Sequence, residues 1–198
     1  MNRYCYVVLL IVLGLLLTAH SGEATEQPTQ PSFADRAQAG IIGATVGEVG
    51  LTTIMAFFEQ IPLSSIPTWP SKLCSSSTSR QGETIVTTEH VLYRSFLMGG
   101  VVGAPVGIAI SEGSRNIKIS AFPEALLGSY LGFGMGVFIA CKLMKLFKML
   151  PESPLHSLLE AAVLIFIPAL GAGVLGAYHY EVGILRETHQ NLSLKKMP

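Results

Sequence analysis

The sequence predicts an all-α fold: a bundle of four membrane-spanning helices that follows an N-terminal signal segment. Three observations predict it. Of the 198 residues, 49% are hydrophobic and 13% are charged, whereas a soluble domain carries about 25% charged residues. Four apolar stretches reach membrane-spanning length, and 15 of the 20 glycines lie inside them. Glycine costs about 1 kcal/mol in a soluble helix relative to alanine, but in lipid it lets two helix backbones approach closely.

The N-terminus has the layout of a secretory signal peptide, which we predict over residues 1–21. Arg3 supplies the positive charge, residues 7–17 are apolar, and the small residues Ala19 and Ser21 precede the expected cleavage site. An uncleaved anchor helix is the alternative interpretation. Residues 22–36 then form a polar lead-in.

Four helices are predicted within a membrane domain that covers residues 37–180. They span about residues 37–58, 95–111, 121–141 and 158–180, with a Pro/Ser-rich loop at 59–90 and a polar tail at 181–198. All four lengths fall within the range of about 17–25 residues that crosses a bilayer. Helices that are apolar on every face would leave a soluble protein without a polar surface. The stretches also lack the alternation of membrane β-strands.

The charge distribution predicts an orientation in the membrane. A signal peptide places residue 22 outside, so the connection that carries Lys142, Lys145 and Lys148 lies inside, as the positive-inside rule requires. We therefore expect an integral protein of a bacterial cytoplasmic membrane with its mature N-terminus and C-terminus outside. Another envelope membrane is the alternative.

Glycines recur at helical spacing within each predicted helix, and we expect them to pack helices together. Contacts within one chain are the preferred interpretation, and contacts between protomers of a homo-oligomer or with other membrane proteins are the alternative. The predicted helix-packing residues are Gly40, Gly43, Gly47, Gly50, Gly99, Gly103, Gly107, Gly128, Gly132, Gly136, Gly171 and Gly176.

Glu48 is the most unusual residue, because it stands near the middle of the first predicted helix. With Thr45 and Thr52 it forms a narrow polar line roughly opposite the glycines. A carboxylate at that depth costs several kcal/mol unless it is paired or faces an aqueous cavity. One interpretation is a hydrogen bond to Thr45, Thr52, Ser129 or Tyr130. The others are a helix register that brings Glu48 to the interface, and an ion or proton pathway.

The sequence contains no convincing motif for nucleotide binding, metal binding or catalysis. The Gly171–Gly176 segment spells GxGxxG, but it lies inside an apolar helix and not between a strand and a helix, as dinucleotide binding requires. His179, Glu181, Glu187 and His189 match no standard metal spacing, and Cys141 is expected to be a small apolar side chain. We expect no catalytic residues, metal or cofactor. The net charge of zero argues against a nucleic-acid partner.

Two segments carry a family resemblance: Gly-Ser-Tyr-Leu-Gly-Phe-Gly at 128–134, and the proline-, glycine- and tyrosine-containing stretch at 168–178. They resemble small, uncharacterised, signal-bearing bacterial envelope proteins, a likeness that covers the C-terminal half and implies no known activity. The four-helix glycine layout is also similar in architecture to the Tim17/Tim23 translocase subunits of mitochondria. Those subunits lack a cleavable signal, and their arginine–aspartate signature is not found before Gly99 and Gly100.

These features together predict a non-enzymatic membrane protein with a structural or assembly role through glycine-mediated helix packing, in which the lipid bilayer is the surrounding medium. The alternative is a small channel, holin-like permeabiliser or transporter subunit that uses Glu48 in a polar pathway.

Overall fold

The computed structural model describes residues 31–58, 88–113, 118–147 and 154–194. The elements in these ranges are α2 (Phe33–Phe58), α4 (Thr88–Ser111), the short 3-10 helix η2 (Ile119–Ala121), α5 (Phe122–Phe147) and α6 (Pro154–Leu194). All are helical, and these ranges contain no strand. The all-α prediction is therefore confirmed. The predicted signal at 1–21 and the Pro/Ser-rich loop up to residue 87 lie outside the described residues.

Four helices are long and apolar enough to cross a membrane, over Phe33–Phe58, Val91–Ser111, Ile119–Leu146 and Leu159–Gln190. The chain is thus an integral membrane protein with multiple spans.

The start of α2 is set by a capping box that the hydrophobic pattern did not reveal. The Ser32 amide and hydroxyl both donate to the Asp35 carboxylate, at 2.9 and 2.7 Å, and the Asp35 amide donates back to Ser32 Oγ at 3.3 Å. Reciprocal bonds of this kind satisfy amides that have no partner within the helix. The helix therefore begins at Phe33 rather than at residue 37, and Arg36 lies in its first turn instead of in the lead-in.

Helix ends also differ from the predicted boundaries elsewhere. Helix α4 ends before Gly113, whose φ of 72° suits glycine and stops the helix. Helix α6 continues past Tyr180 to Leu194, so most of the predicted polar tail is helical. The sequence boundary followed the fall in hydropathy, but the arginine, glutamate and leucine residues beyond it are good helix formers.

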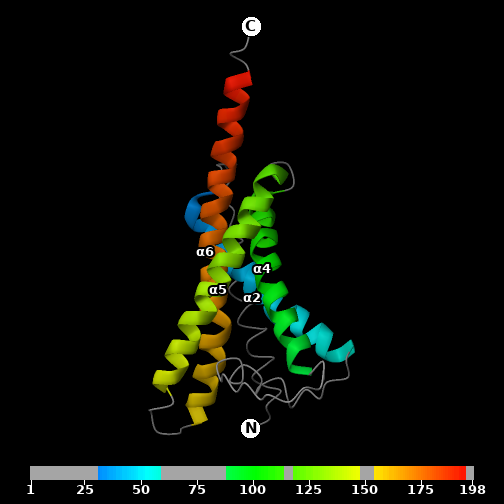
Figure 1. Ribbon diagram of the computed structural model, residues 1–198, viewed down its shortest axis with the longest axis vertical. Coiled ribbons are helices and arrows are strands. Elements are labelled where there is room, and N and C mark those ends of the chain that lie inside the picture. The colour runs from blue at the N-terminus through cyan, green and yellow to red at the C-terminus, as the bar shows by residue number, and fades with distance from the viewer. Residues whose placement is uncertain (1–30, 59–87, 114–117, 148–153, 195–198) are drawn as a thin grey trace, which may run out of the picture.

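Successive helices run antiparallel, and Figure 1 shows α6 rising beyond the ends of the others. Helix α2 packs most extensively on α4, and α5 on α6, while α2 and α6 join the two pairs. The lower ends of the two pairs diverge in Figure 1. The start of α2 and the end of α4 therefore meet η2 and α6 at one end of the bundle, which we call the charged end.

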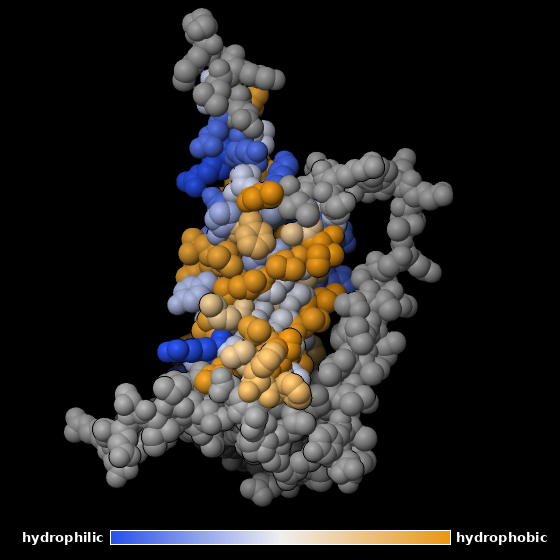
Figure 2. Space-filling model, turned by 90° about the vertical axis from the view of Figure 1, so that its right-hand side faces the viewer, coloured by the Kyte–Doolittle hydropathy of each residue, from blue (hydrophilic) through white to orange (hydrophobic). Residues whose placement is uncertain are grey.

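Small side chains fill most of the core. Ten of the buried hydrophobic residues are alanines, among them Ala44, Ala104, Ala125 and Ala172, each fully buried. Large apolar side chains such as Phe57, Phe138 and Ile110 are exposed instead, and Figure 2 shows apolar residues over the middle of one face, with hydrophilic residues gathered near the upper end. This inside-out distribution suits a protein surrounded by lipid.

Candidate functional site

Glycines bring α2 and α4 into backbone contact. Gly43 lies against Gly103 and Gly107, and Gly47 lies against Gly99. A Cβ added at any of these five positions would fall less than 3.0 Å from backbone of the opposite helix. Neither side has a flexible side chain that can yield, so only glycine fits at this helix crossing.

The α5–α6 pair has the same kind of interface. Gly132 meets the backbone of Gly171, Gly128 meets Leu175 and His179, and a Cβ at Gly136 would lie 2.5 Å from Pro168 Cα. One further contact joins α2 to α6, and another adds to the α5–α6 interface. A Cβ at Gly40 would lie 3.0 Å from Gly173 Cα, and one at Gly176 would collide with Ser129 Oγ.

Gly50 is the exception among the predicted packing residues, because no atom lies within 4 Å of the position that its Cβ would take. The buried residues of α2 explain this. They include Gly40, Ala44, Glu48, Thr52 and Ala56, which recur every fourth position. Such a row forms a helix ridge that packs into a neighbouring groove. Gly50 is two residues from both Glu48 and Thr52, which places it on the opposite side of the helix from this ridge. Glu48 and Thr52 belong to this row and are buried. They therefore face the bundle interior, although the sequence placed them roughly opposite the packing glycines.

Glu48 is completely buried, and neither of its carboxyl oxygens has a hydrogen-bond partner. Its Oε1 lies over Gly100, 2.8 Å from the position that a Cβ of Gly100 would occupy. The ring of Phe133 lies over the same glycine. The carboxyl group therefore sits among α2, α4 and α5 in space that Gly100 leaves free.

None of the expected hydrogen bonds to Glu48 is present. The Thr45 hydroxyl donates to Ile41 O at 2.9 Å, and the Ser129 hydroxyl to Ala125 O at 2.8 Å. Tyr130 is 58% exposed. Thr52 is buried one turn from Glu48 on the same face of α2, but its Oγ1 also has no partner. Hydroxyls in helices donate readily to the backbone carbonyl one turn earlier. The hydroxyls of Thr45 and Ser129 do so, and they are therefore not available to the Glu48 carboxyl.

Arg36 forms a second buried polar site, at the charged end. Its Nε donates to Glu112, the residue that follows α4, and its Nη1 donates to Glu181 of α6 at 2.9 Å. The guanidinium carbon lies 6.0 Å from the ring centroid of Tyr180. The Tyr180 hydroxyl in turn accepts the Lys118 amide at 3.3 Å. We call Arg36, Glu112, Tyr180 and Glu181 the end cluster, and it ties together three of the four long helices.

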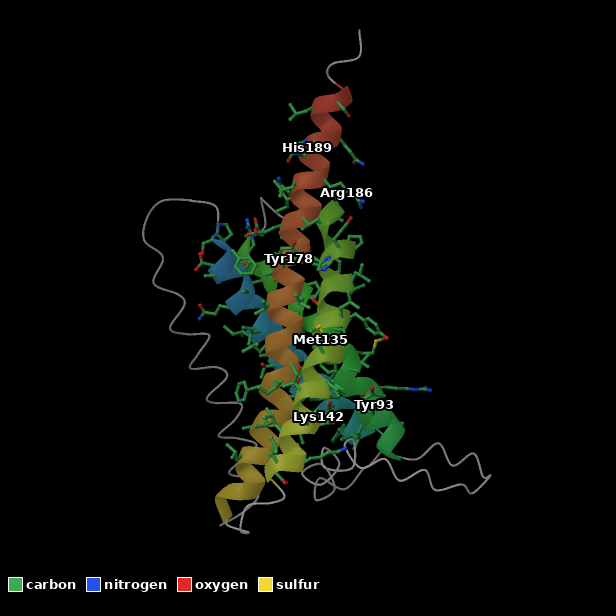
Figure 3. The ribbon with its side chains drawn as sticks, turned by 60° about the vertical axis from the view of Figure 1, so that its left-hand side comes forward. Tyr93, Met135, Lys142, Tyr178, Arg186 and His189 are labelled. Carbon is green, nitrogen blue, oxygen red and sulfur yellow. The ribbon has the colours of Figure 1, made fainter. Side chains whose placement is uncertain are left out.

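A surface groove of about 280 Å3 lies between α4 and α5. Phe133 forms part of its wall, and Gly134 also lines it, with no atom within 4 Å of its Cβ position. Figure 3 shows Tyr93 of α4 and Met135 of α5, which both line this groove. We call it the α4–α5 groove. Sequence reasoning did not find it, because Tyr93 lies before the predicted second helix and Phe133 has no distinguishing sequence signal.

The sequence expectations about metal binding and about Cys141 both concern described residues. No group of three histidine, cysteine or acidic side chains converges there in a way that would hold a metal ion. Figure 3 shows His189 on the part of α6 that extends past the bundle, with Arg186 about one turn below it, where Arg186 pairs with Glu124 of α5. Cys141 is disulfide-bonded, not the free apolar side chain expected from the sequence, and the two other cysteines of the chain lie outside the described residues.

Comparison with known proteins finds no family model, no curated protein and no solved structure that matches this chain. The resemblances drawn from residues 128–134 and 168–178 therefore stay predictions. The fold and the buried polar sites define the class: a multi-pass integral membrane protein with an all-α bundle.

Proposed function

We propose that this protein is a small, non-enzymatic channel- or transporter-type membrane subunit in which Glu48 binds a proton or another cation at mid-membrane depth. The observation that carries the proposal is the fully buried carboxyl with two partnerless oxygens. Polar groups buried in proteins are normally hydrogen-bonded, and an ionisable residue inside a membrane is a functional-site candidate by default.

The packing around Glu48 supports a rigid site. Gly47 and Gly99 hold α2 against α4 next to the carboxyl, and Gly132 and Gly171 hold α5 against α6. These glycines make their close contacts within the chain, so the proposal does not assign them to contacts between protomers. An enzymatic role would need a second polar group that converges on Glu48, and among the described residues no group is hydrogen-bonded to its carboxyl.

Flux through reconstituted vesicles tests the proposal. Vesicles that enclose a pH-sensitive dye should acidify or alkalinise under an imposed potential when the wild-type protein is present. Glu48→Gln should lower that rate by about tenfold, a difference of about 1.4 kcal/mol in barrier. Glu187→Gln is the matched control, because Glu187 lies at the charged end and accepts only from Ser120 there. Wild-type vesicles that are no leakier than empty ones, or equal flux in Glu48→Gln, would refute the proposal.

An assembly role is the second candidate, and the open face at Gly50 favours it. A glycine without a close neighbour in its own chain gives a partner helix a place to approach. Gly50→Leu should then dissociate oligomers in native mass spectra from detergent while the fold is kept. Unchanged spectra would count against this role.

The proposed orientation keeps the charged end outside in a bacterial cytoplasmic membrane. The start of α2 and the end of α6 lie at the same end of the bundle, whereas Lys142 and Lys145 lie near the end of α5, at the opposite end. Single cysteines at Ser193 and Lys145, each exposed, should react with impermeant maleimide from opposite sides of the membrane. Reaction from the same side would overturn the topology.

A further inference from the structure

The ring of Phe133 lies next to both the buried carboxyl of Glu48 and the α4–α5 groove. Phe133 is 1% exposed and packs edge-on against Phe96 with ring centroids 5.5 Å apart. One side of it lines the α4–α5 groove. Its Cδ2 lies 2.6 Å from the Cβ position of Gly100, over which Glu48 Oε1 also lies. A group in the groove is therefore one aromatic ring away from Glu48.

The groove lies on the surface between α4 and α5, beside exposed apolar residues. Leu131 and Met135 on its α5 side are 47% and 60% exposed, and Tyr93 contributes from α4. Gly134 leaves the floor without a side chain. Aromatic and apolar walls with a few polar atoms are typical of sites for small organic ligands.

We propose that the α4–α5 groove and Glu48 together form a lateral binding site for a lipophilic amine, which enters from the bilayer. This inference rests on the proposed function of Glu48 and names its ligand class. The apolar body lies in the groove, and the amine passes the Phe133 edge to reach the carboxyl. The ring then also faces the cation, an arrangement that contributes about 0.5–2 kcal/mol.

The chemistry around the carboxyl favours an organic cation over a metal ion. Hard metal cations take six or more oxygen ligands. The unpartnered oxygens in this part of the described core are the two of Glu48 and the hydroxyl of Thr52. An ammonium group needs fewer oxygens and gains from the adjacent aromatic ring.

Proton transfer balances without a further reactant. A neutral amine crosses the lipid, and its nitrogen lone pair takes the proton from the Glu48 carboxylic acid. The products are an ammonium ion and a carboxylate held as an ion pair, so the buried site keeps zero net charge and neither ion is left unpaired.

Photolabelling of the full-length protein in nanodiscs tests the inference. The probes are a diazirine derivative of dodecylamine and the matching derivative of dodecanol, with labelled peptides identified by mass spectrometry. The amine should label peptides of α4 and α5 at the groove about tenfold more than the alcohol does, which corresponds to about 1.4 kcal/mol. Equal labelling by both probes in the wild type overturns the inference, and this comparison does not depend on any variant.

Variants locate the effect. Glu48→Gln should bring amine labelling down to the alcohol level, and Gly134→Leu should reduce labelling by both probes because leucine fills the groove. Val106→Leu is the control, an exposed position on α4 that does not line the groove, and should leave labelling unchanged. If Glu48→Gln stops proton flux but keeps the amine preference, the lateral site is wrong while the proposed function stands.

Discussion

Arg36 and Glu48 lie on the same helix, and both are buried, but the fold treats their charges in opposite ways. Arg36 donates to two carboxylates, one directly after α4 and one on α6, whereas both oxygens of Glu48 are without a partner. The difference shows that this bundle can pair a buried charge where helix ends meet at the charged end. An unpaired carboxyl in the same structure therefore costs stability, and we attribute its presence to ligand binding.

The largest expected effect comes from removing the satisfied charge. Arg36→Met leaves Glu112 and Glu181 without their cation, and should lower the free energy of unfolding by about 3–5 kcal/mol. Unfolding in mixed micelles, followed by circular dichroism, measures it. Arg94→Met is the control, because Arg94 is exposed and exposed substitutions usually change stability by less than about 0.5 kcal/mol. Similar values for both variants would remove the distinction between the two sites.

The glycine contacts should give the next largest effect. Gly132→Leu forces a side chain into the backbone of Gly171, and should destabilise the bundle by about 1–3 kcal/mol or more. Gly134→Leu lies two residues along the same helix in open space and should unfold close to the wild type in the same assay. Equal losses would mean that the α5–α6 interface is not the one described.

Glu48→Met should change stability in the other direction. Replacing the orphaned carboxyl with an apolar side chain removes an unsatisfied buried group, so the free energy of unfolding should rise by about 1–2 kcal/mol. The same chemical unfolding experiment measures it beside Arg36→Met. A clear loss of stability would show that Glu48 has a structural partner, and the comparison between the two charges would fail.

Thr52→Val should give the smallest gain. The Thr52 hydroxyl is buried without a partner, so its removal should raise stability by about 0.5–1 kcal/mol. Thr45→Val is the matched control, because the Thr45 hydroxyl donates to Ile41 O and its removal should bring no gain. If both variants change the free energy of unfolding by the same amount, the Thr52 hydroxyl has a hydrogen-bond partner in the folded protein.

The sequence predicted much of the fold, and particular residues show what it could not predict. Glu48 stood out because a charge interrupts an apolar stretch, a purely local signal. The sequence did not predict that the Glu48 carboxyl lacks hydrogen-bond partners, because the hydroxyls of Thr45 and Ser129 donate to backbone carbonyls of their own helices instead. Gly47 and Gly50 looked equivalent on a helical wheel. Only the helix contacts separate them, because a Cβ at Gly47 would collide with Gly99 O and one at Gly50 would meet no atom within 4 Å.

The sequence by itself determined the four membrane spans and the all-α class, because length and apolarity belong to each segment alone. The tertiary structure decided which surfaces meet. Arg36 pairs with residues 76 and 145 positions away, and the α4–α5 groove exists only where two helices pass without filling the space between them. Such pairings depend on helix crossing and register, which no single segment specifies.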